Sequence, residues 1–143
     1  KMTRAMLVTV LYRAAGEPTV TGITNKFTDN KQGQYYYNAV LWASNMGIVN
    51  GATATTFDPN GNVTREQIAA ILYRYAGSPS VTGSLSGYSD QAQVSSFAVT
   101  AMQWAVGSGI ITGVTSGGKT TLSAKGNATR AQVAVMLHRF LTF

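Results

Sequence analysis

Residues 64–74 read TREQIAAILYR, and close variants of this stretch stand at residues 3–13 (TRAMLVTVLYR) and 129–139 (TRAQVAVMLHR). Each stretch opens with Thr-Arg, carries a second arginine nine residues after the first, and has apolar residues at helical spacing between the two. The starts of successive stretches are 61 and 65 residues apart. Self-similarity at this period indicates tandem copies of one helical unit.

The threonine that opens each stretch predicts the N-terminus of a helix. Thr64 with Gln67, and Thr129 with Gln132, form the capping-box pattern, in which a hydroxyl and an amide satisfy the first free N–H groups of the helix. In the first stretch Met6 occupies the fourth position and cannot complete the box. We therefore expect three Thr-capped helices, two of them with a full box.

Upstream of the second and third stretches, three further motifs recur in the same order. The pairs are 27–29 with 88–90 (aromatic-x-Asp), 39–43 with 101–105 (an alanine-rich helix containing Trp), and 47–51 with 109–113 (Gly-Ile-x-x-Gly). The spacing predicts upstream helices at about residues 35–46 and 96–108, each ended by a glycine in the left-handed conformation. The Gly- and Thr-rich stretches that follow, such as 114–119, are expected to be polar loops.

These patterns predict an all-α fold built from tandem helix–loop–helix repeats. The repeats are assigned to residues 1–16 (second helix only), 17–78 and 79–143. Because such a unit cannot bury its apolar stripe alone, the three repeats are expected to share a core. The first repeat lacks an upstream helix. Part of its Leu7, Val10 and Leu11 stripe should therefore be uncovered, or covered by another chain in a homo-oligomer.

Composition excludes several classes of function. The 143 residues contain no cysteine, which rules out disulfides, thiol catalysis, Cys-rich zinc sites and iron–sulfur clusters. The single histidine, His138, argues against a multi-histidine metal site and a Ser-His-Asp triad. With five acidic residues and no evident nucleophile–base pair, we expect neither an enzyme nor a cofactor.

The net charge of +6 favours an anionic partner. The cations are scattered and belong to no nucleic-acid-binding motif, so we expect no nucleic-acid partner. No run approaches 18 apolar residues, which predicts no membrane insertion. The opening at Lys1 carries no signal peptide, and we expect the chain to be part of a longer protein.

Taken in order, the motifs resemble those of the S-layer homology family over essentially the whole chain. That family's unit runs from an aromatic-x-Asp start through an Ala-Val-x-x-Ala helix, a Gly-Ile-x-x-Gly turn and a Phe-x-Pro step to a Thr-Arg-Ala-Glu helix. The second repeat supplies every step, including Phe57-Asp-Pro59. The third has Leu122-Ser-Ala124 in place of Phe-x-Pro, and Met6, Gln67 and Gln132 replace the glutamate.

The resemblance implies a pseudo-threefold helical domain that holds extracellular proteins on the bacterial cell surface. Modules of this family bind a secondary wall polysaccharide that often carries pyruvate ketals. The implied role is a non-catalytic anchor for an anionic cell-wall polysaccharide. The alternative is a structural or protein-interaction module that keeps the fold but has lost sugar binding. The missing glutamates and the incomplete first repeat leave this alternative open.

The arginine after each capping threonine is the first candidate contact for an anionic polymer. Arg4, Arg65 and Arg130 stand in a first helical turn, where free N–H groups and the helix dipole favour an anion. A guanidinium there can hold a carboxylate with two hydrogen bonds. The structural alternative is an ion pair with an acid such as Asp29 or Asp90, which themselves either accept sugar hydroxyls or cap the unit.

Aromatic and glycine residues complete the set of candidate sugar contacts. Trp42, Trp104 and Tyr35 could stack on a sugar ring, or the tryptophans could belong to the core. Gly51 and Gly113 close the two Gly-Ile-x-x-Gly turns. They either let a ligand approach the backbone or simply permit a tight turn.

Overall fold

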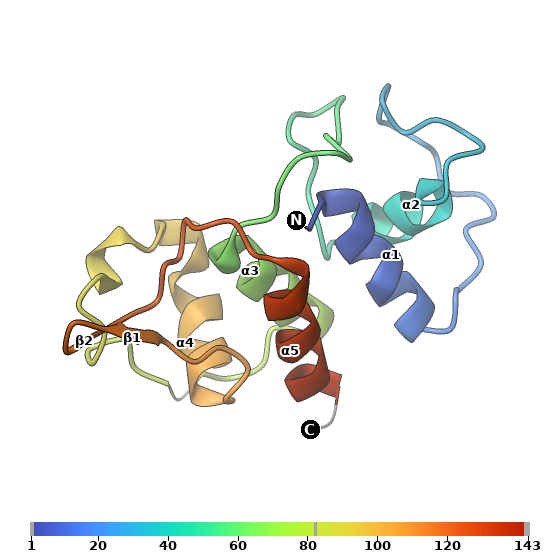
Figure 1. The fold of residues 1–143 in the computed structure, drawn as a ribbon. Coiled ribbons are helices and arrows are strands. Elements are labelled where there is room, and N and C mark those ends of the chain that lie inside the picture. The colour runs from blue at the N-terminus through green and yellow to red at the C-terminus, as the bar shows by residue number, and fades with distance from the viewer. Residues whose placement is uncertain (1, 82, 142–143) are drawn as a thin grey trace. The chain divides into compact units, whose positions relative to one another are not determined.

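A computed structural model describes residues 2–81 and 83–141 (Figure 1). The helices are α1 (Arg4–Ala14), α2 (Tyr37–Asn45), α3 (Arg65–Tyr75), α4 (Val99–Gly107) and α5 (Arg130–Leu141), with short 3-10 helices η1 (Gln91–Gln93) and η2 (Ser96–Ala98) and strands β1 (Val114–Ser116) and β2 (Lys119–Thr121). Helix accounts for 42% and strand for 7%. The fold is thus mostly helical, with one small sheet that an all-α prediction does not include. None of the described helices has the length and apolarity needed to cross a membrane.

The chain divides into two compact units, the N-terminal unit (Met2–Asn62) and the C-terminal unit (Val63–Phe143). In the N-terminal unit α1 packs on α2, and in the C-terminal unit α3 packs on α4. A Thr-capped helix therefore pairs with the upstream helix of the next sequence repeat. This division differs from the sequence repeats 1–16, 17–78 and 79–143, which remain a prediction about periodicity.

Each unit has its own apolar core beneath this helix pair. The fully buried side chains of the N-terminal unit include Leu7, Val8, Leu11, Val40 and Phe57. Those of the C-terminal unit include Val63, Ile68, Leu72, Met102, Ile110, Ile111 and Leu122. Because Phe57 and Leu122 come from loops, the loops contribute to each core together with the helices.

The predicted helix caps are confirmed. The Thr64 hydroxyl accepts from the Gln67 N–H at 3.3 Å, and the Gln67 side chain accepts from the Thr64 N–H at 3.0 Å. Thr129 and Gln132 make the same pair of hydrogen bonds, at 3.1 Å each. At α1 only the threonine half of the box is present, as Met6 requires.

The upstream helices are shorter than the sequence predicts. We expected helix at about residues 35–46 and 96–108, whereas α2 starts at Tyr37 and α4 at Val99. Neither has a side chain that caps its first turn, which explains the late start. The predicted glycine stops are confirmed, with φ of +74° at Gly47 and +75° at Gly109.

The segment 114–119, expected to be a loop, begins a β-hairpin. Val114 pairs with Thr121, and Ser116 pairs with Lys119. Gly117 and Gly118 between the strands have φ of +58° and +77°. Two consecutive positive φ values match the twist of a tight hairpin, and glycine adopts them at little cost.

The apolar stripe of α1 is better covered than predicted. Leu7 and Leu11 are fully buried, and only Val10, 36% exposed, leaves apolar surface in contact with solvent. The packing of α1 on α2 accounts for the cover, because α2 belongs to the following repeat. The expectation of an uncovered stripe is therefore wrong for Leu7 and Leu11.

Gly113 should not tolerate a side chain. A Cβ there would lie 2.5 Å from Thr120 Cγ2, 2.6 Å from Tyr88 Cε1 and 3.0 Å from the Thr121 carbonyl oxygen. We predict that Gly113→Ala lowers the free energy of unfolding by about 1–3 kcal/mol, because the crowding must be relieved by moving backbone. The matched control is Gly87→Ala in the same unit, where a Cβ meets nothing within 4 Å. Equal urea midpoints for the two variants would contradict this account.

Candidate functional site

Arg65 connects the start of α3 to two loops of the C-terminal unit. Its Nε donates to the Leu122 carbonyl at 2.8 Å, and its Nη2 donates to the Thr112 carbonyl at 3.3 Å. The side chain is only 5% exposed. The cap that Thr64 makes fixes the direction of the first turn of α3, and this directs the Arg65 guanidinium toward these loops.

Asp90 holds the same loop from its other side. Its carboxylate accepts from the Leu122 N–H at 2.8 Å and from the Ser123 N–H at 2.9 Å. The carbonyl of Leu122 is therefore bound by a cation and its N–H by an anion. We call this arrangement the Arg–Asp clamp.

The N-terminal unit contains a second Arg–Asp clamp. Arg4 Nε donates to the Phe57 carbonyl at 2.9 Å, and its Nη2 donates to the Asn50 carbonyl at 2.6 Å. Asp29 accepts from the N–H groups of Phe57 and Asp58, both at 2.8 Å. The Arg4 guanidinium carbon also lies 4.7 Å from the centre of the Phe57 ring. The clamp is thus a repeated device of this fold.

Burial lowers the pKa of both clamp arginines, but both side chains remain protonated. Desolvation lowers the pKa of Arg4, and the charges of Asp58 and Asp29 partly offset this effect. Desolvation likewise lowers the pKa of Arg65, with Asp90 acting in the opposite direction. An arginine pKa starts so high that both side chains remain cations at physiological pH.

A pocket of about 200 Å³ opens beside Arg65 in the C-terminal unit. It is lined by Arg65, Arg139, Gln132, Val135 and Met136 and by the turn residues 110–114, Gly113 among them. Arg139 Nη1 donates to the Ile110 carbonyl at 3.3 Å and is 3.5 Å from the Thr112 hydroxyl. We call this the arginine pocket. It brings two guanidinium groups and one side-chain amide to a single glycine turn.

No carboxylate of a described residue lines the arginine pocket. The C-terminal unit has two acidic residues, Glu66 and Asp90. Glu66 is buried and accepts from the Ser95 N–H at 3.0 Å, while Asp90 is committed to the clamp. The pocket can therefore bind an anion by two cationic side chains. The Gln132 side-chain oxygen accepts from the Thr129 N–H in the helix cap, so its Nε2 is the atom that can donate to a neutral polar group.

The two tryptophans are core residues in this structure. Trp42 is 5% and Trp104 is 7% exposed. The Trp42 ring centre lies 5.5 Å from that of Tyr12, and Trp104 lies at the same distance from Tyr73. Each indole therefore packs beneath a tyrosine of the preceding Thr-capped helix, and its use in sugar binding stays a prediction.

The remaining candidates lie apart from the arginine pocket. Tyr35 is 60% exposed and lines a separate pocket of about 250 Å³ with Tyr37, Arg13 and other residues of the N-terminal unit. Arg130 is exposed at the start of α5 and does not line the arginine pocket. Gly51, the counterpart of Gly113, is packed against the Phe27 ring and the carbonyls of Thr53 and Thr56.

Sequence reasoning missed Arg139 and Gln132 as pocket residues. In the sequence Arg139 stands out only as the second arginine of its stretch, and Gln132 only as part of a helix cap. The available signal was helical spacing along α5: Val135 and Met136 lie three and four residues after Gln132, and Arg139 lies four and three residues after them. That spacing places them on one face, although it does not reveal what the face meets.

The fold and these sites define a helical repeat module with a cationic pocket beside its Thr-capped helices. The family model described as S-layer homology domain matches residues 26–69 and 87–134, and this chain belongs to that family. Domains of this family are cell-surface anchoring modules, which places the chain at the bacterial cell surface.

Relatives carry the module as a small part of a larger protein. The chain is 34% identical to a surface-layer 125 kDa protein of Lysinibacillus sphaericus, over 79% of the chain and 10% of that protein. It is 33% identical to an endoglucanase of Bacillus sp. (strain KSM-635), over 98% of the chain and 15% of that enzyme. An undecaheme cytochrome from the S-layer of Carboxydothermus ferrireducens has a similar fold, with a TM-score of 0.53 and 18% identity over 99% of the chain and 22% of the cytochrome.

The clamp should make the stability of the N-terminal unit depend on pH. Burial acts to raise the pKa of Asp29, but hydrogen bonds from Phe57 and Asp58 outweigh it and hold the pKa below its ordinary value of 3.8. A depressed pKa stabilises the folded state above the unfolded value, and this contribution is lost as the pH falls from about 4 through the folded value. We predict that Asp29→Asn destabilises the unit at about pH 6 and that the deficit shrinks below about pH 4.

Urea unfolding of wild type and variant across this pH range measures the effect. Glu17→Gln, which removes an exposed carboxylate from the same unit, controls for the loss of one charge. A deficit for Asp29→Asn that stays constant with pH would show that the carboxylate charge is not what holds the loop.

Proposed function

We propose that this chain anchors its parent protein to the cell wall by binding an anionic wall polysaccharide, pyruvylated polymers included, and that the arginine pocket is a contact site. The observation that carries the proposal is the pairing of Arg65 and Arg139 at the Gly113 turn with no carboxylate lining the pocket. A surface-anchoring family and a net charge of +6 both agree with an anionic partner.

The two arginines have different tasks in this proposal. Arg65 is almost fully buried and donates two hydrogen bonds to loop carbonyls. It therefore supplies a fixed positive charge to the pocket wall. Arg139 is half-buried, and its contacts with the Ile110 carbonyl and the Thr112 hydroxyl, at 3.3 and 3.5 Å, are long. Long contacts cost little to exchange, so Arg139 is free to turn its fork toward a carboxylate of the polymer.

The Gly113 turn also brings an apolar side chain to the pocket. Val114, 48% exposed, follows the turn and gives the C–H face of a sugar ring an apolar surface. The Gln132 amide can pair with a ring hydroxyl. A carboxylate-bearing sugar thus finds a cation, a polar partner and an apolar contact in one place.

We extend the proposal to the finer architecture implied by the family. The three Thr-capped helices would pack as a pseudo-threefold domain, with repeats bounded at 1–16, 17–78 and 79–143. The incomplete first repeat would then be the place where a second copy of the chain could join.

Arg139→Gln should weaken binding to purified wall sacculi about tenfold, because one charge-assisted hydrogen bond to the polymer is lost. The helical signal and the urea midpoint should stay close to wild type, since only long contacts are removed. Lys125→Gln is the matched control, because it removes an exposed cation of the same unit that does not line the pocket.

The same binding assay is repeated with sacculi stripped of their non-peptidoglycan polymer. Retention on intact walls alone supports polysaccharide binding. Equal retention on stripped walls would favour the protein-interaction alternative. Equal affinities for Arg139→Gln and Lys125→Gln would remove the arginine pocket from the proposal.

A further inference from the structure

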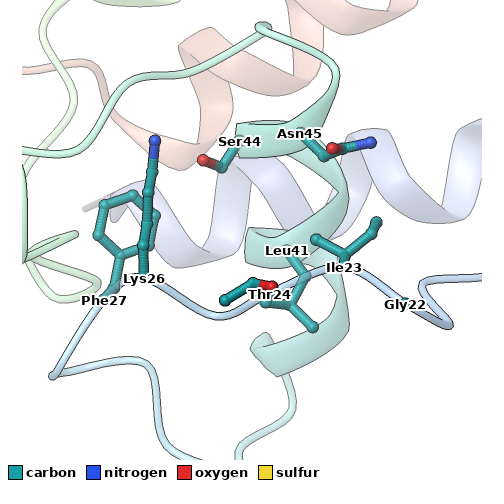
Figure 2. Close-up of a pocket in the computed structure, with 8 residues that line it drawn as sticks. All are labelled: Gly22, Ile23, Thr24, Lys26, Phe27, Leu41, Ser44 and Asn45. Carbon is teal, nitrogen blue, oxygen red and sulfur yellow. The ribbon is translucent and has the colours of Figure 1, made fainter.

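A further polar pocket lies in the N-terminal unit, and its lining residue Phe27 has its ring centre 5.5 Å from that of Phe57 in the Arg–Asp clamp. It has a volume of about 450 Å³ and lies between the segment 22–27 and the C-terminal half of α2. Figure 2 shows Lys26 beside Phe27 at one end, with Ser44 and Asn45 on α2 above Ile23, Thr24 and Leu41. We call this the Lys26 pocket. Its volume is within the range of small-molecule sites.

Polar groups in the Lys26 pocket are available to a ligand. Within the described chain, the side chains of Thr24, Ser44 and Asn45 have no hydrogen bond to protein. The Lys26 ammonium lies 5.4 Å from the centre of the Phe27 ring, and no acidic side chain lines the pocket. One cation, two hydroxyls and one amide are therefore exposed together.

The floor of the pocket is apolar. Leu41 is 5% exposed and Ile23 is half-buried. Polar groups around an apolar floor are what a sugar ring needs, because the ring has hydroxyls at its edge and C–H groups on its faces.

The matching segment of the C-terminal unit differs from 22–27 in sequence and in its packing on the helix. With Phe27 aligned to Tyr88 and Trp42 to Trp104, the positions of Thr24, Lys26, Ser44 and Asn45 are taken by Leu85, Gly87, Val106 and Gly107. Leu85 is buried, and a Cβ on Gly83 would overlap the Gln103 carbonyl and lie 2.9 Å from the Gly107 nitrogen. The segment there packs directly on α4. The lining of the Lys26 pocket therefore depends on residues that the matching positions of the C-terminal unit do not have.

We propose that the Lys26 pocket binds a single sugar residue that carries a carboxylate. The carboxylate pairs with the Lys26 ammonium, hydroxyls pair with Ser44 and Asn45, and a C–H face lies over Ile23 and Leu41. The inference rests on the proposed function, because the sugar is assumed to be part of the wall polymer. It adds a contact site, in a different unit from the arginine pocket, that differs from it in lining chemistry.

The test is an NMR titration of the full chain with glucuronate, and with glucose as the neutral counterpart, up to about 50 mM, where a millimolar Kd is saturated. Glucuronate should shift the backbone amides of residues 22–27 and 41–45, and glucose should shift them far less. Lys26→Gln should weaken glucuronate binding about five- to tenfold. Lys31→Gln, an exposed cation of the same unit that does not line the pocket, should bind as wild type does.

A second variant keeps the Lys26 charge and removes the hydroxyl of Ser44. Ser44→Val introduces the residue type of the C-terminal unit and should also reduce the shifts, with the urea midpoint unchanged. Absence of shifts at 22–27 and 41–45, equal shifts with glucose, or full binding by Lys26→Gln would each overturn the inference. Amides 110–114 report on the arginine pocket independently. Shifts confined to them would reject the Lys26 pocket and retain the proposed function with its arginine pocket. Shifts confined to 22–27 and 41–45 would support the Lys26 pocket and remove the arginine pocket from the proposed function.

Discussion

One backbone residue in each unit is held from both sides by opposite charges, and the loops of this fold depend on it. Phe57 and Leu122 each give a carbonyl to an arginine and an N–H to an aspartate. The loops between the helices contain little regular structure that could satisfy buried backbone groups. A hydrogen bond to a charged group contributes about 1.5–3 kcal/mol, which gives these few contacts a large share of a typical domain's stability.

The clamp also shapes what the surface can bind. In the C-terminal unit, Asp90 and Glu66 are occupied by backbone N–H groups, so Arg65 and Arg139 face the Gly113 turn without a carboxylate between them. The structural role of Arg65 and its place in the pocket wall are therefore two consequences of one position at the start of α3. The two units share the clamp but differ in their pockets, so duplication of the fold does not imply duplication of the binding chemistry.

Local patterns in the sequence were enough to predict the caps, the helix stripes and the glycine stops. Thr64 with Gln67 and the stop at Gly47 depend on residues within a few positions of each other. The acceptors of Arg65 lie 57 and 47 residues away along the chain, and nothing local identifies a carbonyl as the partner rather than a carboxylate. The pairing of α1 with α2 and of α3 with α4, each across a repeat boundary, could not be predicted for the same reason. The hairpin at Gly117-Gly118 was signalled by its two glycines, but the surrounding threonines also suit a loop.

Backbone hydrogen exchange measured by NMR in Arg65→Lys tests the clamp most directly. Lysine keeps the charge but lacks the fork that reaches two carbonyls. The account predicts that the amides of Leu122 and Ser123 exchange about tenfold faster or more, because the loop opens locally. Amides in α3, in α4 and at Phe57 and Asp58 in the other unit should keep their wild-type rates. Unchanged exchange at Leu122, or equal acceleration throughout the C-terminal unit, would contradict the claim that this arginine holds the loop.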